Sequence, residues 1–327
     1  MGDPIAFAEH PSRIIAHALQ LAGQTKWFAL VTSVAIEGGA ARELGSLAVV
    51  DEDGQMTGYL SNGCIDKDIQ LHALDTLQSG AKKLLRYGDG SQYADLTLPC
   101  GGALSVLIDP DPDLDALTRL GMAFDARQVG TLTFTLPVNS QDAETIVRFE
   151  YKPQFRLVLA GRGAIFRAVA MVGHATGFEV ACLSPDTDDL AAVQRLTQMP
   201  PVHLTSPSQD VSLETLDAHA AFLTLFHDHE WEPELLRAAL KTPAHFIGSL
   251  GSRRTHAGRL DRLRHFGVSE AAIERLHGPI GLVPSLRDAP LIAVSSIAEI
   301  ASTLPPSIRR LPQDVRANSQ ALESHPV

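Results

Sequence analysis

The chain has 327 residues, of which 45% are hydrophobic and 20% are charged, and its 27 Lys and Arg against 38 Asp and Glu give a formal net charge of −11. This acidic balance argues against a protein that binds nucleic acid through the phosphate backbone, because such proteins present a basic surface. The sequence lacks the run of about 18 apolar residues that a membrane span needs, and its start lacks the features of a signal peptide. Three cysteines are too few for a disulfide scaffold, so we expect a cytoplasmic protein.

The length predicts two domains, and residues 1–153 have the pattern of a small mixed α+β domain. Helical spacing begins at Ser12, a candidate N-cap, and the Asp53-Gly54 step is a hairpin signal between two apolar segments. The acidic segment 109–113 contains two prolines and predicts a rigid turn. We expect helices at residues 12–22 and 66–79, and strands at residues 27–36, 46–50, 56–60, 104–108, 131–136 and 146–151.

Beyond a boundary near Pro153, short apolar strands alternate with helical segments. This alternation implies βαβ units around a parallel sheet, so we predict a Rossmann-like α/β domain over residues 154–303. Residues 304–327 are polar and contain several prolines, which predicts a tail without regular structure. The expected strands of the second domain cover residues 155–160, 178–183, 220–226 and 245–247.

The first strand of the second domain leads into Gly161-Arg162-Gly163 and then into a helix. Glycines in this setting allow a pyrophosphate to approach the free amides at a helix N-terminus. Asp186, shortly after the second strand, is a candidate partner for a ribose hydroxyl. Phe166 at the third glycine position and Ser184 at the strand tip depart from a dinucleotide motif. The turn therefore either binds a ligand or only reverses the chain.

A second anion site is predicted where a later strand gives way to a helix, at Gly251, Ser252, Arg253 and Arg254. Ser252 is a suitable N-cap, and the free amides, hydroxyl groups and two guanidinium groups favour an anion. The alternative is a solvated basic face of the helix. We prefer that alternative for the later residues Arg262 and Arg264.

Two cysteines, Cys64 and Cys100, stand beside glycine in separate loops of the first domain. Cys64 precedes a predicted helix, whose dipole favours the thiolate. The pair suggests thiolate chemistry or a soft metal, and the alternative is two small core residues, which we expect Cys182 to be. The accompanying candidate residues are Asn62, Gly63, Asp66, Gly101 and Gly102.

Polar residues follow the strand predicted at 220–226, beginning with His227 and Asp228. Parallel sheets place ligands at the carboxyl ends of their strands, so this segment is either a metal or acid–base site or a loop that caps the next helix. In the first domain, Arg42 follows a pair of glycines and is either an anion anchor or a surface arginine.

Taken together, these segments resemble the xanthine dehydrogenase accessory protein family, XdhC/CoxI, from about Phe28 to Ile300. The chain departs from the family pattern at Asn62 and Asp66, where members tend to have Gly and Glu. It also departs after Leu282, where members tend to have an Ile-Gly and a Thr-Pro step. The matching pieces are residues 38–45, 58–66, 100–102, 161–163, 227–229, 244–254, 267–269, 276–282, 293–295 and 298–300.

The resemblance implies an accessory factor and not a metabolic enzyme, and we assign no catalytic residues. Such a protein binds the molybdenum cofactor, as molybdopterin or its dinucleotide form, and supports its sulfuration together with a cysteine desulfurase. It then inserts the cofactor into a molybdenum hydroxylase such as xanthine dehydrogenase. We expect the ligand between the domains, with Cys64 and Cys100 toward the metal and the anion donors opposite. We expect no NAD(P) and a homodimer, the commonest symmetric assembly.

Two other functions are compatible with the same residues. The first is an NAD(P)-dependent oxidoreductase built on the Rossmann-like domain, with His227 as its acid–base residue. The second is a protein-interaction scaffold that keeps a nucleotide-binding fold without the ligand. Affinity for NADH or NADPH distinguishes the first from a cofactor chaperone, and binding of a partner protein without cofactor distinguishes the second.

Overall fold

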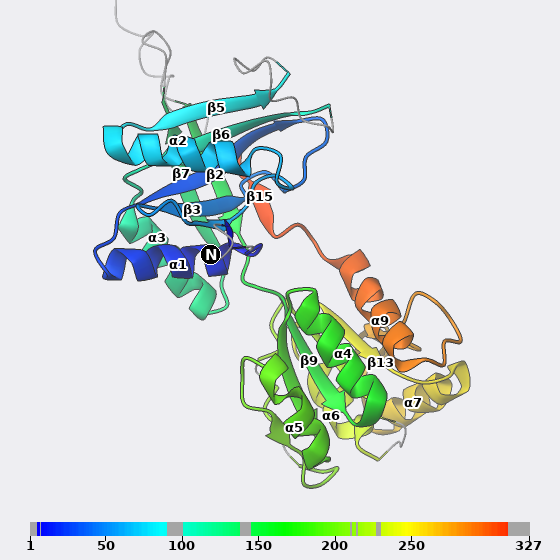
Figure 1. Cartoon of the computed structure of the whole chain (residues 1–327). Helices are drawn as coiled ribbons and strands as arrows, with labels where there is room; N and C mark the ends of the chain where they lie inside the picture. Colours follow the sequence, from blue (N-terminus) through cyan, green and yellow to red (C-terminus); the bar gives the residue numbers. More distant parts are fainter. Residues whose placement is uncertain are drawn as a thin grey trace, which may run out of the picture. The chain divides into compact units, whose positions relative to one another are not determined.

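Residues 154–305 form one structural unit, and residues 1–153 form the other together with 306–327 (Figure 1). The computed structural model describes residues 5–6, 8–89, 101–137, 145–209, 211–213, 215–226 and 230–312. Among these residues, no helix has the length and apolar character required to cross a membrane.

The first unit is built around a six-stranded sheet in the order β1-β4-β3-β2-β6-β5. Its neighbouring strands are antiparallel except for the β1–β4 pair. Successive side chains of a strand point to opposite faces, so the sheet has two apolar faces to cover. The strands are β1 (Ile5–Ala6), β2 (Phe28–Glu37), β3 (Leu47–Asp51), β4 (Met56–Gly58), β5 (Lys83–Gly88) and β6 (Ala103–Asp109).

Helix α2 (Asp66–Ser79) covers one face of this sheet. The other face is covered by α1 (Pro11–Gly23), α3 (Leu114–Asp125) and a three-stranded sheet in the order β15-β8-β7. That second sheet consists of β7 (Gly130–Leu136), β8 (Thr145–Tyr151) and β15 (Ile308–Arg310).

The second unit has a parallel six-stranded sheet in the order β11-β10-β9-β12-β13-β14. Counted along this unit, the order is 3-2-1-4-5-6, the arrangement of dinucleotide-binding Rossmann folds. The strands are β9 (Arg156–Gly161), β10 (Glu179–Ser184), β11 (Val202–His203), β12 (Ala220–Leu225), β13 (Phe246–Ser249) and β14 (Leu276–His277).

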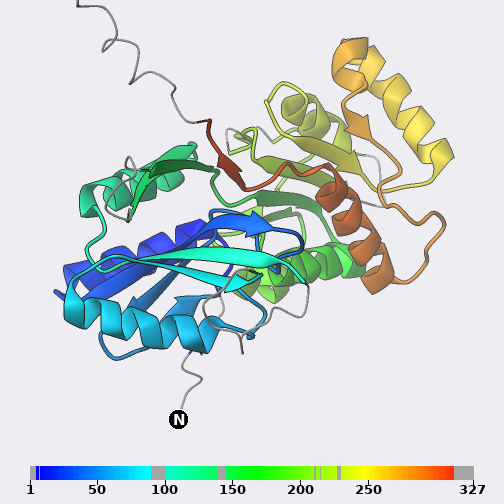
Figure 2. The same cartoon turned by 90° about the horizontal axis from the view of Figure 1, so that it is seen from above.

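Both faces of the parallel sheet are covered by helices, which explains why its strands are buried along their length. Helices α4 (Gly163–Ala175) and α9 (Ala289–Thr303) lie side by side on one face (Figures 1 and 2). The opposite face carries α6, α7 and α8. The remaining helices are α5 (Thr187–Val193), α6 (Glu232–Ala239), α7 (Arg253–His265), α8 (Glu270–Ile273) and a short 3-10 turn at Gln194–Leu196.

The predicted fold class, a Rossmann-like domain after a smaller α+β domain, is confirmed. Two local expectations are corrected. The N-cap of α1 is His10, whose ring nitrogen accepts a hydrogen bond from the amide of Ser12 at 3.2 Å. Part of the expected tail is ordered, because β15 pairs with β8 and buries Ile308 in the core of the first unit. The remaining tail residues, 313–327, lie outside the described part of the chain.

Candidate functional site

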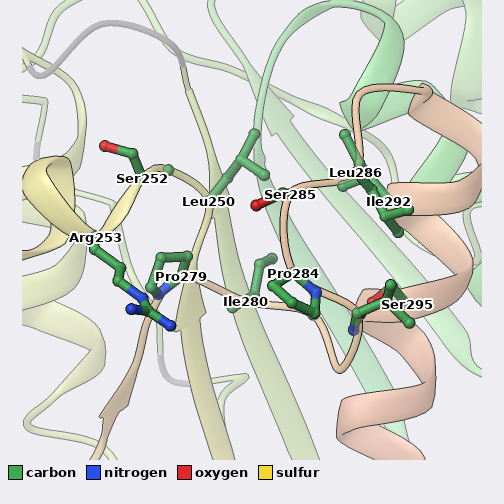
Figure 3. Close-up of a pocket in the computed structure, with 13 residues that line it drawn as sticks. Leu250, Ser252, Arg253, Pro279, Ile280, Pro284, Ser285, Leu286, Ile292 and Ser295 are labelled. Atoms are coloured by element: carbon green, nitrogen blue, oxygen red, sulfur yellow. Dashed lines mark hydrogen bonds between the residues drawn. The ribbon is translucent and has the colours of Figure 1, made fainter.

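A pocket of about 730 Å³ lies in the second unit, where β13 leads into α7. Ser252 and Arg253 at the start of α7 lie on one side of it, and Ile292 and Ser295 of α9 lie on the other (Figure 3). Ligand pockets typically enclose roughly 300–1,000 Å³, so this volume suits a small organic molecule. The other lining residues are Leu250, Gly251, Pro279, Ile280, Gly281, Val283, Pro284, Ser285 and Leu286.

The α7 side of the pocket is rich in hydrogen-bond donors. Ser252 is the N-cap of α7, as predicted, and its hydroxyl accepts from the amide of Thr255 at 3.1 Å. Within the described part of the chain, the amides of residues 251–254 donate no hydrogen bond, and the exposed Arg253 and Arg254 side chains form no ion pair. Free amides and a guanidinium at a helix N-terminus attract an anion.

The opposite wall is a loop that α9 holds in place. Ser295 accepts from the amide of Val283 with its hydroxyl oxygen at 2.8 Å and from that of Leu282 with its carbonyl oxygen at 3.3 Å. The Glu299 carboxylate accepts from the amide of Gly281 at 2.5 Å. These bonds fix the apolar residues of the loop against the pocket.

A buried ion pair supports the turn beside the pocket, between β13 and α7. The Glu232 carboxylate at the start of α6 binds the guanidinium of Arg259 from α7, with Nε–Oε2 and Nη2–Oε1 distances of 3.0 and 3.1 Å. Arg259 also donates to the carbonyl of Leu250 at 2.7 Å, and the hydroxyl of Ser249 donates to Glu232 at 3.2 Å. These bonds fix the turn that leads from β13 into α7.

The glycine turn after β9 is placed as the sequence predicts, but its first helical amide already has a partner. Gly161 has no room for a side chain, because a Cβ would lie 2.7 Å from the carbonyl oxygen of Leu225. Arg162 is the N-cap of α4, and the amide of Gly163 donates to the carboxylate of Asp189 at 2.5 Å. Asp189 is buried and also binds Arg167. A carboxylate of the chain itself thus occupies the place expected for a phosphate.

Asp186 is the N-cap of α5, and its Oδ1 accepts from the amides of Asp188 and Asp189 at 2.9 and 3.0 Å. The side chain is exposed at the carboxyl end of β10. Its position after the second strand agrees with the predicted one. In the structure, Asp186 caps the N-terminus of α5.

Cys64 is exposed on the loop that joins β4 to α2. The buried carboxylate of Asp66 shapes this loop, accepting from the amides of Leu60, Ser61 and Gly63 at 2.8, 3.1 and 3.0 Å and from the Ser61 hydroxyl at 2.6 Å. Asn62 and Gly63 are exposed beside the thiol. Asp66 therefore supports the loop, whereas Asn62, Gly63 and Cys64 face outward.

Three described segments of the first unit lie at the same end of its six-stranded sheet. The strand registers place the end of β2, the end of β4 and the start of β6 at this end. Gly102 packs so closely on the backbone of Glu37 and Gly39 that a Cβ would clash, whereas Gly101 is exposed. The sheet thus brings the Cys64 loop, the Arg42 loop and the segment that follows Cys100 to the same end.

Arg42 is engaged within the first unit. Its Nη2 donates to the carbonyl of Glu9 at 2.6 Å, and its guanidinium lies 4.7 Å from the ring centre of Tyr59. An ion pair of 3.6 Å to the Glu9 carboxylate adds to these contacts. The arginine thus ties the loop after β2 to the segment before α1.

Cys100, His227 and Asp228 lie outside the described residues. Among the residues that are described, no three His, Cys, Asp or Glu side chains gather as a metal site would require. Cys182 lies in the core, as predicted, and burial raises the pKa of its thiol to about 12.

No local pattern in the sequence indicates Asp189, the Glu232–Arg259 pair or the loop that forms the far wall of the pocket. Asp189 stands in an acidic helix start, a pattern that is typical of solvent-exposed side chains. The ion pair joins residues that are far apart in the sequence. The loop contains Gly278-Pro279 and Pro284, which mark it as irregular without indicating what it encloses.

Comparison with known proteins gives family matches in both units. A family model for the XdhC Rossmann domain matches residues 157–300, and one for the XdhC and CoxI family matches residues 21–88. The molybdenum cofactor insertion chaperone PaoD of Escherichia coli (strain K12) is 32% identical over 301 residues, which span 88% of this chain and 87% of PaoD.

Two further proteins are similar over most of this chain. The uncharacterized protein YqeB of Escherichia coli (strain K12) is 26% identical over 288 residues, which span 88% of this chain and 45% of YqeB. The crystal structure of a xanthine dehydrogenase from Bacillus halodurans has a TM-score of 0.71 at 20% identity, covering 88% of this chain and 95% of that one. At 20% identity, the similarity to the Bacillus halodurans structure shows the fold alone.

Proposed function

The chain belongs to the XdhC and CoxI family, and from that premise we propose that it binds the molybdenum cofactor and delivers it to a molybdenum hydroxylase of the xanthine dehydrogenase type. The similarity to an insertion chaperone, at 32% identity over 88% of the chain, supports this proposal. The cofactor is cargo here, and the protein has to hold it and release it intact.

The structural observation that carries the proposal is the exposed Cys64 thiol on a loop with a buried support. Molybdenum bound by the dithiolene of a pterin is a soft metal, and thiolate is a ligand that soft metals prefer. A loop fixed by four hydrogen bonds to one carboxylate presents the sulfur in a defined position at little entropic cost.

The proposal includes two protein partners besides the hydroxylase. A cysteine desulfurase supplies sulfur to the bound cofactor before insertion, and a second copy of the chain forms a homodimer. We place the protein in the cytoplasm, in keeping with the free thiols of Cys64 and Cys182. Affinity capture with and without bound cofactor, followed by measurement of mass in solution, tests these partners.

The strand order 3-2-1-4-5-6 favours one alternative, an NAD(P)-dependent oxidoreductase. The Asp189 carboxylate on the amide of Gly163 opposes it, because a pyrophosphate would have to displace a buried negative charge. A Kd for NADH or NADPH in the low micromolar range would favour the oxidoreductase over the chaperone.

Cofactor retention tests the chaperone directly. Purified protein is incubated with molybdenum cofactor without oxygen and desalted, and bound molybdenum and pterin are assayed. We expect near-stoichiometric retention by the wild type, a loss with Cys64→Ser, and no change with Cys182→Ala, whose thiol is buried away from solvent. Cys100→Ser shows whether the second predicted thiol contributes. A wild-type protein that retains no molybdenum contradicts the proposed function.

A further inference from the structure

We propose that the second unit binds the phosphate-bearing end of a phosphorylated heteroaromatic ligand in the pocket between α7 and α9, and not at the glycine turn after β9. In a Rossmann fold of this strand order, the glycine turn is the expected phosphate site. The inference deepens the proposed function and rests on it only for the identity of the ring.

A carboxylate of the same chain already occupies the glycine turn. Asp189 accepts from the amide of Gly163, and its charge is balanced by Arg167. Two further carboxylates, Asp186 and Asp188, are exposed at the same end of the sheet. A phosphate at this turn would replace an internal ligand of equal sign and would face two like charges, which the electrostatics disfavour.

The pocket beside β13 has the opposite charge pattern. Of its 13 lining residues, Arg253 alone is charged, so no carboxylate among them repels an anion. Four successive amides, at residues 251–254, have no acceptor within the described chain. Gly251, Ser252 and Arg253 line this cavity, and their amides together with the Arg253 guanidinium match the acceptor oxygens of a phosphate or pyrophosphate.

The rest of the pocket suits a flat ring attached to that phosphate. Apolar side chains from three segments line it, among them Leu250, Ile280, Pro284 and Ile292. The Ser295 hydroxyl uses its oxygen to accept from Val283, which leaves its hydrogen to donate to a ring atom. An apolar wall with a few placed polar groups is the usual lining of a site for a heterocycle.

The buried Arg259–Glu232 pair holds this arrangement in place before any ligand arrives. Arg259 fixes the carbonyl of Leu250, immediately before the four free amides. Glu232 in turn receives both Arg259 nitrogens and the Ser249 hydroxyl. A preformed cradle reduces the ordering entropy that a ligand has to overcome.

Isothermal titration calorimetry with inorganic pyrophosphate and the four ribonucleoside diphosphates tests the inference on the full chain. We expect a nucleoside diphosphate to bind more tightly than pyrophosphate, because it also covers the apolar wall. Arg253→Ala should weaken both by at least about tenfold, as the loss of a charged hydrogen-bond donor predicts. Arg264→Ala, at an exposed arginine near the other end of α7 and outside the pocket lining, is the matched control and should leave the Kd within about threefold.

Two more variants separate the pocket from the glycine turn. Ile292→Trp fills the apolar side, so it should weaken the diphosphates and leave pyrophosphate unchanged. Asp189→Asn keeps an acceptor for Gly163 and removes the charge, and it should leave both affinities unchanged. An Asp189→Asn variant that binds tenfold more tightly, or an Arg253→Ala variant that binds as the wild type does, overturns the inference.

The outcomes also separate this inference from the proposed function. Cofactor retention that neither Arg253→Ala nor an excess of pyrophosphate reduces would contradict the pocket and leave the chaperone proposal standing. Diphosphate binding that depends on Arg253, in a protein that retains no molybdenum, would support the pocket and contradict the chaperone. Wild-type protein that binds none of the probes overturns the inference.

Discussion

Two buried carboxylates, Asp66 and Asp189, each accept hydrogen bonds from the backbone of a glycine-containing loop. The sequence suggests that Asp66 faces a ligand and that Asp189, in an acidic helix start, faces solvent. In both cases burial shows that the carboxylate faces the protein instead. In the first unit, the Asp66 carboxylate supports a loop that exposes Cys64. In the second unit, the Asp189 carboxylate binds the amide of Gly163, so this amide is not free to bind a ligand.

Replacing Asp66 by Asn tests the support of the Cys64 loop. The two bonds to Oδ2, from the Ser61 hydroxyl and the amide of Gly63, lose their acceptor. We expect the free energy of unfolding to fall by about 3 kcal/mol, in line with hydrogen bonds to a buried charge, and the rate of Cys64 modification by a thiol reagent to change. Urea unfolding and thiol titration in a Cys100→Ser background measure both effects.

The control for Asp66→Asn is Asp75→Asn, at an exposed position of the same helix, α2. It should change stability by less than about 0.5 kcal/mol. Equal effects of the two substitutions would contradict a supporting role for Asp66.

A second residue-scale prediction concerns pH. Burial, with smaller contributions from Arg127 and Arg42, lowers the pKa of His10 from 6.5 to about 4. The unfolded chain therefore takes up a proton between pH 6.5 and 4 that the folded chain excludes. The free energy of unfolding should fall as pH falls through this window, by about 3 kcal/mol in all, and this contribution should be constant above it.

His10→Asn is the variant that isolates this effect, because Asn also caps helices but does not titrate. Its unfolding free energy, measured by urea at several pH values, should change less between pH 6.5 and 4 than that of the wild type. Parallel curves for the two proteins would show that His10 does not carry the dependence.

At the scale of elements, the packing of α4 on its sheet depends on Gly173. A Cβ there would clash with the buried Leu157 of β9 and would approach Val180 and Ile297 within 4 Å. Gly173→Ala should destabilise the second unit by about 1–2 kcal/mol, because overpacking outweighs the helix preference for Ala. Gly258→Ala in α7, where no atom lies within 4 Å, should stabilise it slightly instead. Thermal unfolding of both variants checks the difference in sign.

Elements with a clean pattern could be predicted from the sequence. The helix expected at residues 66–79 and the Asp53-Gly54 hairpin between β3 and β4 are observed, because local periodicity and a turn residue determine them. β5 was not predicted because its apolar pair, Leu84 and Leu85, is too short to form a strand pattern. α3 was not predicted because the two prolines before it indicate a turn, although Asp113 caps the helix.

The candidate site was predictable to a similar degree. Ser252 as the N-cap of α7, beside Arg253, follows from local residue types, and the structure places both at a pocket. The opposite wall depends on hydrogen bonds from the loop at residues 278–286 to Ser295 and Glu299 of α9. These contacts are tertiary, so no local sequence pattern predicts them. The closure of the glycine turn by Asp189 is likewise a tertiary contact.

At the scale of the whole molecule, the second unit is inserted into the first. The chain leaves the first unit after Pro153 and returns to it at Pro306 to add β15 beside β8. A chain that ends at Pro305 should therefore lose Ile308 from the core of the first unit, at a cost of about 3 kcal/mol. Hydrogen exchange should become faster in β7 and β8 and stay unchanged in β9 and β12.

A chain that ends at Pro312 retains β15 and is the control for this truncation. It should exchange as the full chain does in β7 and β8. Identical exchange in the two truncated chains would mean that β15 contributes nothing to the first unit.

The return of β15 also sets an order of events during synthesis. The loop after β2, which carries Arg42, is completed by contacts that arrive late: Gly45 lies against Ile308, and Glu43 accepts a hydrogen bond from Ser307 at 3.0 Å. On the ribosome, this corner of the first unit stays open until the whole second unit has emerged. We expect a nascent chain interrupted within the second unit to expose an unpaired edge of β8, because β15 has not yet been made. Such an edge makes an incomplete chain prone to aggregation.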